Sequence, residues 1–159
     1  MELIVGMGDY GLSDRRDAVI RTFALGTCVA VTAYSPAQRA AGMVHVVLPF
    51  PLDSRDGAER PARFASTGVP LLVGAMCTRY GCQPEELTIQ LYGGADAMPG
   101  PDVYRVGQKN IDAVKRALLG MGLTIHRADL RGNLSRSLAM QVNTGSVAVF
   151  RQPIPTSRR

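Results

Sequence analysis

Two stretches of the chain place apolar residues at helical spacing. From residue 63 to 80 the apolar side chains recur every three or four positions, which predicts an amphipathic helix that is kinked or restarted at Pro70. The same spacing predicts a second helix over about 108–121, where Gly122 is a typical stop signal. These are the two main helices that the pattern supports.

The other apolar runs are short and rich in β-branched residues, which is typical of strands. They cover residues 2–6, 19–23, 28–34, 42–48, 87–92, 123–128, 137–142 and 146–150. The polar segment that follows the first run, up to about residue 17, is predicted to be a loop. Several adjacent strands are too closely connected for helical crossovers, so we expect an α+β fold with mostly antiparallel pairing.

The length of 159 residues and the lack of internal repeats favour one domain, 1–159, with a flexible basic tail from about residue 152. No apolar run approaches the roughly 20 residues that a membrane-spanning helix needs. The first residues do not resemble an export signal, so we expect a cytoplasmic protein. Three cysteines, an odd number, indicate reduced thiols and not a disulfide framework.

The net charge of +5 is concentrated at the end of the chain. From residue 127 onward there are six arginines, and Asp129 is the only acid. Such a basic end could attract an acidic protein or nucleic acid, while the plainer interpretation is a solvated surface. Phe150 is the only aromatic residue of the segment, which argues against a surface on which bases stack.

Cys28 and His45 form the first candidate for chemistry. Cys28 opens one predicted strand after Gly26, and His45 lies in the next, with a turn near Pro36 between them, so the two side chains can meet. An imidazole beside a thiol can lower the pKa of the thiol and carry protons during the reaction. The alternatives are a hydrogen-bonded core histidine and an ordinary buried cysteine.

Other polar residues carry weaker signals. His126 is expected to be an ordinary strand residue, and Cys77 and Cys82 lack the second pair of ligands that a structural zinc site needs. Gly93-Gly94 follows a strand but has neither the lysine of a phosphate loop nor the further glycine of a dinucleotide fingerprint. We therefore expect no metal and no organic cofactor.

Five separated segments form an ordered set. They are residues 25–31 (LGTCVAV), 41–49 (AGMVHVVLP), 92–98 (YGGADAM), 106–111 (VGQKNI) and 132–137 (GNLSRS). In order and spacing they resemble the chemoreceptor glutamine deamidases of the CheD family. The resemblance implies conversion of receptor glutamines to glutamates through a cysteine thioester, and a CheC-type phosphatase as partner. It also implies a β-sandwich-like core flanked by helices, similar to the catalytic domain of cytotoxic necrotizing factor.

The resemblance further assigns roles to residues. It implies that Cys28, His45 and Thr22 act together, with the Thr22 hydroxyl holding the imidazole in position as the third member of a triad does. Taken without the resemblance, Thr22 is an unremarkable strand residue. Thr27 stands where the family usually has serine and is a candidate substrate contact, because the hydroxyl is kept.

Three other functions remain open at this stage. The same nucleophile would serve a transglutaminase-like or peptidase-like enzyme that also forms a thioester. A non-catalytic adaptor that binds the phosphatase would keep the fold without turnover. Nucleic-acid binding by the basic end would depend strongly on salt concentration.

Overall fold

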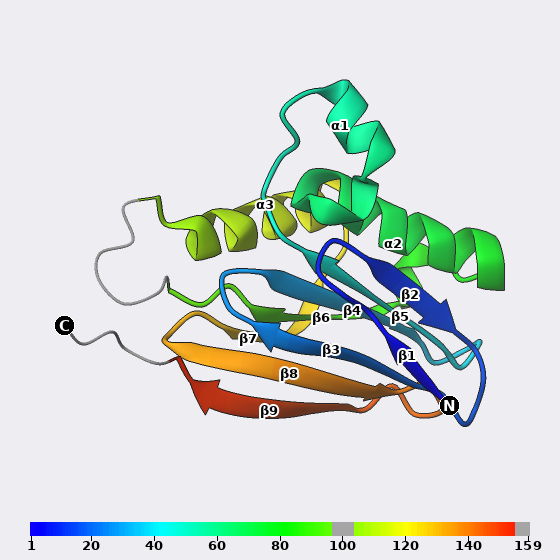
Figure 1. Ribbon diagram of the computed structural model, residues 1–159. Coiled ribbons are helices and arrows are strands. Elements are labelled where there is room, and N and C mark those ends of the chain that lie inside the picture. Colours follow the sequence, from blue (N-terminus) through cyan, green and yellow to red (C-terminus); the bar gives the residue numbers. More distant parts are fainter. Residues whose placement is uncertain (97–103, 155–159) are drawn as a thin grey trace.

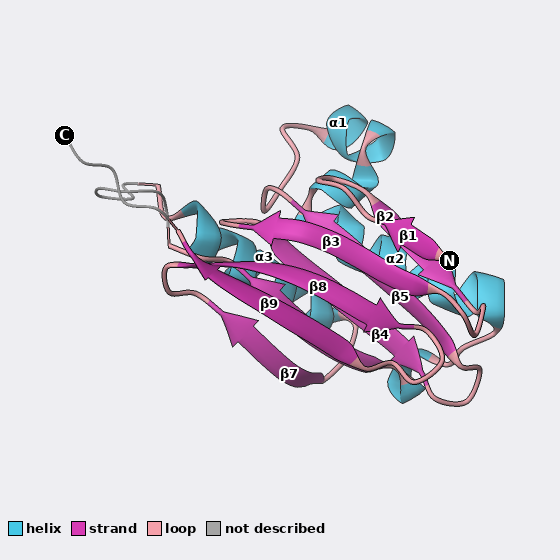
Figure 2. Cartoon of the chain, turned by 60° about the horizontal axis from the view of Figure 1, so that its bottom comes forward, coloured by secondary structure: helices cyan, strands magenta, loops and turns pink. Residues whose placement is uncertain are grey.

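The computed structural model describes residues 1–96 and 104–154 of the chain. Two β-sheets face each other, and the two long helices cover the outer face of one of them, which gives three layers (Figure 1). The view in Figure 2 shows the strands of the uncovered sheet lying in front of those of the other and running in a similar direction. Within the described residues, no helix is long and apolar enough to cross a membrane.

The uncovered sheet has the strand order β1-β3-β8-β9 and the covered sheet β2-β5-β4-β6-β7. The first comprises β1 (Glu2–Ile4), β3 (Val19–Leu25), β8 (Leu134–Gln141) and β9 (Val147–Pro153). The second comprises β2 (Tyr10–Ser13), β5 (Ala40–Val46), β4 (Val29–Ser35), β6 (Thr88–Gly93) and β7 (Ile125–Leu130). The helices are α1 (Ser54–Glu59), α2 (Ala65–Tyr80) and α3 (Val106–Gly120), with short 3₁₀ turns at Pro61–Arg63 and Pro84–Glu86.

Strands β4 and β5 are buried on both faces, because one face meets the helices and the other meets the second sheet. Val31 and Val44 belong to the core under the helices, whereas Ala30 and Met43 belong to the core between the sheets. This double burial explains why both strands read as continuous apolar runs in the sequence. It also means that a polar side chain in either strand, such as that of His45, must find its partner inside the protein.

The predicted fold class is confirmed in its main features. The architecture is α+β with two packed sheets, and all strand pairs are antiparallel except β1 with β3 and β6 with β7. Both predicted helices are present. Helix α2 runs continuously from Ala65 to Tyr80 with Pro70 inside it, so the predicted restart at the proline is wrong.

Two elements differ from the sequence prediction. Strand β2 lies in the segment predicted to be a loop, and it forms because Tyr10–Ser13 pairs with β5 along its length. Helix α1 is a third, short helix whose first turn is capped by Asp53, which accepts a hydrogen bond from the Asp56 N–H at 2.8 Å. The tail predicted from about residue 152 overlaps the end of β9, and residues 155–159 lie outside the described part of the chain.

Candidate active site

His45 and Thr22 are hydrogen-bonded to each other across the space between the two sheets. The Thr22 hydroxyl oxygen lies 2.7 Å from His45 Nδ1, and the hydroxyl donates to the Val5 carbonyl oxygen, also at 2.7 Å. Because a hydroxyl has one proton to donate, the threonine must accept from Nδ1–H, which assigns the neutral tautomer with a lone pair on Nε2. His45 Nε2 is buried and has no hydrogen-bond partner among the described residues.

The protonation state of His45 follows from its burial. The side chain is 1% exposed, and this burial lowers the pKa of His45 from 6.5 to about 4. At neutral pH the ring is therefore uncharged. Its free nitrogen can take up a proton during a reaction but does not hold one in the resting protein.

Cys28 lies immediately before β4, on the same side of the sheet as His45. Ala30 is the direct partner of His45 in the β4–β5 register, and Cys28 precedes Ala30 by two residues. Side chains two residues apart in an extended segment point to the same face, so the thiol and the imidazole are diagonal neighbours. In agreement, Cys28 packs against the apolar cluster between the sheets that contains Ala30.

The charge state of Cys28 differs from the sequence expectation. The pattern predicted a thiol whose pKa is lowered by the neighbouring imidazole. In the structure, burial raises the pKa of the Cys28 thiol, although the positive charge of Arg63 acts in the opposite direction. The physical reason is that His45 is neutral and supplies no positive charge. The resting pair is therefore thiol and imidazole, not thiolate and imidazolium.

The backbone around Cys28 is fixed by three consecutive carbonyl groups. The Gly26 carbonyl accepts from the Ala95 N–H at 2.8 Å, and the Cys28 carbonyl accepts from the Gly94 N–H at 2.7 Å. Gly93, at φ +108°, runs so close that a Cβ there would lie 2.3 Å from the Cys28 carbonyl oxygen. The glycine pair thus serves close backbone packing, which is a use of glycine unrelated to phosphate binding.

Asn110 of α3 ties down the third carbonyl, which is that of Thr27. Its side-chain amide nitrogen donates to the Thr27 carbonyl at 3.0 Å and to the Val47 carbonyl at 2.9 Å. The side chain is fully buried and joins the residue before Cys28 to the chain that follows His45. Sequence reasoning missed Asn110, although an amide next to Ile111 on the apolar face of a predicted helix was a usable signal.

The backbone N–H groups of Thr27 and Cys28 are hydrogen-bond donors that the described fold leaves available beside the thiol. The three carbonyls of this segment accept hydrogen bonds, but neither of these N–H groups donates one to another residue in the described part of the chain. Free backbone donors beside a nucleophile are what stabilises a negatively charged oxygen in acyl transfer. No hydrogen bond of the Thr27 hydroxyl is found within the described residues, so the side chain is free to contact a ligand.

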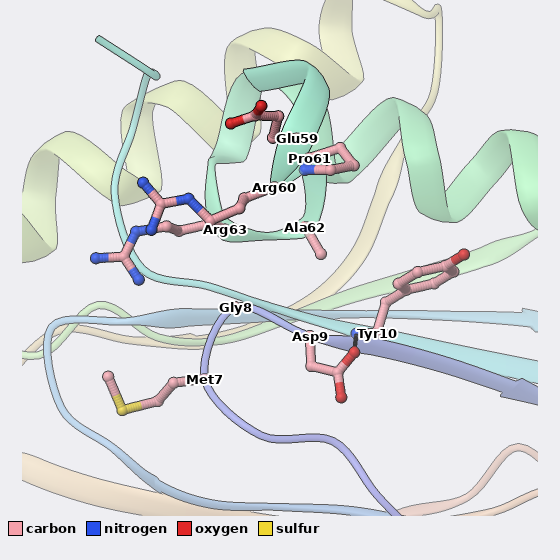
Figure 3. Close-up of a pocket in the computed structure, with 9 residues that line it drawn as sticks. All are labelled: Met7, Gly8, Asp9, Tyr10, Glu59, Arg60, Pro61, Ala62 and Arg63. Carbon is pink, nitrogen blue, oxygen red and sulfur yellow. Dashed lines mark hydrogen bonds between the residues drawn. The ribbon is translucent and has the colours of Figure 1, made fainter. Parts of the chain in front are cut away.

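A cavity of about 340 Å³ adjoins the site (Figure 3). One wall is the segment Met7–Tyr10, in which the Gly8 N–H donates to the His45 carbonyl at 2.8 Å, and the Asp9 carbonyl accepts from the His45 N–H at 3.0 Å. The other wall is Glu59–Arg63, and the Arg63 carbonyl accepts from the N–H groups that follow β5. The cavity is therefore attached by backbone hydrogen bonds to the strand that carries His45.

The remaining polar residues have structural roles. His126 does more than expected of an ordinary strand residue, because its Nδ1 accepts the Ile89 N–H at 3.0 Å where the β6–β7 register shifts. Cys77 and Cys82 are free thiols. In the part of the chain that the structure describes, no group of three or more histidine, cysteine or acidic residues could hold a metal ion.

The basic end is less available to ligands than its charge suggested. Asp129 binds two of its arginines, Arg136 at 3.0 Å and Arg151, while Arg131 lies 3.4 Å from Asp96. Arg136 is buried, and its guanidinium also donates to two backbone carbonyls. Much of the positive charge is thus engaged within the fold, which weakens the case for nucleic-acid binding.

Fold and site together define a two-sheet α+β protein in which a thiol, an imidazole and a hydroxyl lie at one end of the inter-sheet core. This is the set of groups that cysteine-dependent acyl-transfer enzymes use. Residues 47–151 match the family described as "CheD chemotactic sensory transduction". The chain belongs to the CheD family.

Individual relatives agree with this assignment. A Syntrophotalea carbinolica protein named "Probable chemoreceptor glutamine deamidase CheD" is 42% identical over 151 residues, 93% of each chain. A Desulforamulus reducens protein of the same name is 36% identical over 153 residues, 93% of this chain and 89% of the relative. Among solved structures, Bacillus licheniformis hypothetical protein YfiH matches 78% of this chain and 49% of its own, with 12% identity and a TM-score of 0.48.

Proposed function

We propose that this chain hydrolyses glutamine side chains of chemotaxis receptors to glutamate, with Cys28 as nucleophile, His45 as proton carrier and Thr22 as the residue that positions the imidazole. The relatives named above carry this activity in their names. The observation that carries the proposal is the hydrogen bond from His45 Nδ1–H to Thr22, which leaves Nε2 unpartnered on the face of the sheet where Cys28 lies.

The first half of the reaction forms a thioester. As the Cys28 sulfur attacks the carboxamide carbon, its proton passes to His45 Nε2, and the carbonyl oxygen becomes an oxyanion that the Thr27 and Cys28 N–H groups can bind. The imidazolium then gives this proton to the amide nitrogen. The carbon–nitrogen bond breaks, ammonia leaves, and the sulfur holds the glutamyl group.

The second half releases the product. A water molecule gives a proton to His45 Nε2 and attacks the thioester carbon, and the carbon–sulfur bond breaks. The sulfur leaves as thiolate and takes the proton back from the imidazolium, which restores the neutral pair. Because burial disfavours the charged ring, the imidazolium forms only for the short time in which a proton is in transit.

Intact-mass measurement on a purified receptor cytoplasmic fragment, combined with an ammonia assay, tests the proposal. We expect the mass gain of an amide-to-acid exchange in step with ammonia release, and neither signal with Cys28→Ala. Cys77→Ala, which removes a thiol away from the site, should behave as the wild type. Chain cleavage would indicate a peptidase, and uptake of an added amine a transglutaminase.

Other expectations stand as parts of the same proposal. We expect the protein to act in the cytoplasm, without metal or organic cofactor, and to bind a CheC-type phosphatase. Co-purification of the phosphatase with wild-type protein and with Cys28→Ala tests that partner. If Cys28→Ala left receptor modification unchanged while the phosphatase still bound, the chain would be an adaptor. Likeness to the catalytic domain of cytotoxic necrotizing factor stays a prediction about the fold.

A further inference from the structure

Resting on the function proposed above, we infer that the cavity between Met7–Tyr10 and Glu59–Arg63 is a substrate subsite. Its ligand is an acidic side chain of the receptor helix about one turn from the target glutamine, and Arg63 is the group that binds the carboxylate. The subsite would make the enzyme select glutamines by their neighbours in the substrate helix.

The position of the cavity supports this use. The loop from Gly8 to Asp9 is hydrogen-bonded to both the N–H and the carbonyl of His45. The Arg63 carbonyl accepts from Val47 and Leu48, at 2.8 and 3.2 Å, just beyond the end of β5. Both walls are thus held by the strand end that lies opposite Cys28, which places the cavity beside the part of the sheet that carries the thiol.

Two of the four charged residues that line the cavity, Glu59 and Arg60, have ion-pair partners, whereas Asp9 and Arg63 have none among the described residues. Arg60 pairs with Asp56 at 2.6 Å, Glu59 pairs with Arg55 at 3.2 Å, and the Asp9 carboxylate accepts the Tyr10 N–H. The guanidinium of Arg63 makes no hydrogen bond or ion pair with any residue in the described part of the chain. It is half-buried, and although its charge acts on the Asp56 carboxylate, which Arg60 already pairs, the N–H donors of Arg63 are unengaged within the described residues.

The chemistry of this group favours a carboxylate. A guanidinium presents a planar fork of N–H donors that fits a carboxylate with two parallel hydrogen bonds. Figure 3 shows the side chains of Met7, Arg60 and Arg63 extending to the same side of the cavity. The exposed methionine can cover the methylene groups of a glutamate whose carboxylate reaches Arg63.

Helix geometry sets the spacing along the substrate between the target glutamine and the acidic residue. Residues three or four positions apart on a helix lie on one face, with Cβ atoms about 5–6 Å apart. Arg63 is close enough to Cys28 for its charge to act on the thiol. We infer that a helix that presents a glutamine to Cys28 directs the side chain of the next or preceding turn to the cavity. A cavity of about 340 Å³ accommodates such a side chain but not a whole helix.

The test uses the full-length enzyme and a receptor fragment whose modified glutamine has been mapped by mass spectrometry. Each acidic residue within four positions of that glutamine is replaced in turn by alanine, and kcat/KM is measured with wild type, Arg63→Gln and Arg16→Gln. Arg16 is an exposed arginine in the turn between β2 and β3, so its variant controls for the loss of one positive charge.

With wild type we expect loss of one substrate carboxylate to lower kcat/KM about tenfold to a hundredfold, mainly through KM, which is the range for a charge-assisted hydrogen bond. Arg63→Gln should cause the same loss on the unaltered substrate and no further loss on the altered one. Arg16→Gln should retain the wild-type preference. Arg63→Glu combined with a lysine at the substrate position should regain activity, which a purely structural role of Arg63 would not produce.

Two results would overturn the inference and leave the deamidase function standing. One is a modified glutamine with no acidic neighbour within four positions. The other is an Arg63→Gln defect of equal size on both substrates, which would mean that Arg63 acts on the reacting amide or on the fold. A wild-type enzyme that modifies no glutamine at all would instead remove the proposed function, and the subsite with it.

Discussion

Replacing Asn110 by alanine should separate the positioning of Cys28 from the stability of the fold. The variant loses hydrogen bonds of 3.0 and 2.9 Å to the carbonyls of Thr27 and Val47, both of which are half-buried residues. Each buried acceptor left without a donor costs about 1–3 kcal/mol. Because water can reach half-buried groups, we expect a total loss of about 2–4 kcal/mol, within the 5–15 kcal/mol of a typical domain.

The effect on activity should be larger than this loss of stability implies. Without the amide, the segment before Cys28 is no longer joined to the chain after His45, and a displacement of about 1 Å between reacting groups can lower the rate about a hundredfold. We therefore expect kcat/KM for receptor deamidation to fall on the order of a hundredfold, although most molecules remain folded. Urea unfolding and ammonia release, measured at the same temperature, give the two quantities.

Leu118→Ala is the matched control for Asn110→Ala. Leu118 is buried on the same helix, and its apolar side chain can make no hydrogen bond to the Cys28 segment. Its truncation should cost about 2–5 kcal/mol. We expect this variant to keep near-normal activity at temperatures where it is folded. If both variants lost activity equally, or if iodoacetamide labelled Cys28 at the wild-type rate in Asn110→Ala, the positioning role would be refuted.

Three further predictions follow from the structure. The pKa of His45 is about 4 in the folded protein and 6.5 in the unfolded chain, so the unfolded state binds more protons between these pH values. The free energy of unfolding should therefore fall by up to about 3 kcal/mol as the pH drops from 6.5 to 4. Urea unfolding of His45→Gln should depend less on pH than that of the wild type, and an equal dependence would contradict the lowered pKa. Gly93→Ala should lower stability by more than about 2 kcal/mol and reduce activity, because φ is +108° and the new Cβ meets the Cys28 carbonyl. Gly74→Ala, on the open surface of α2, should instead raise stability by up to about 1 kcal/mol in the same unfolding assay. His126→Ala should cost about 1–3 kcal/mol, because it removes the acceptor of the N–H of buried Ile89 at the β6–β7 register shift. An unchanged unfolding midpoint would show that water replaces the imidazole.

Local patterns in the sequence were sufficient to predict most of the secondary structure and the proximity of Cys28 and His45. Apolar periodicity located α2, α3 and the strands with continuous apolar runs, because burial of one face directly determines that pattern. The short turn near Pro36 placed Cys28 and His45 in neighbouring strands, as the β4–β5 register has them. Strand β2 was missed because its pairing with β5, and not its own composition, makes it a strand.

The rest of the site depends on contacts between distant parts of the chain. Nothing local to Thr22 indicates that its hydroxyl lies between Val5 and His45, because that arrangement is set by how the two sheets pack. Similarly, the sequence could mark Asn110 as an amide on an apolar helix face, but that it binds the Thr27 carbonyl depends on how α3 packs against β4. Spacing also could not reveal the burial that leaves Cys28 and His45 uncharged at rest.

The central place of β3 in its sheet has a consequence for how the protein acquires its activity. Strand β3 pairs with β8, so Thr22 is secured only when residues more than a hundred positions later have joined the sheet. A chain still emerging from the ribosome can carry both Cys28 and His45 and still lack the partner that orients the ring. The protein would then become active only at the end of folding, so enzyme activity indicates that both sheets have assembled.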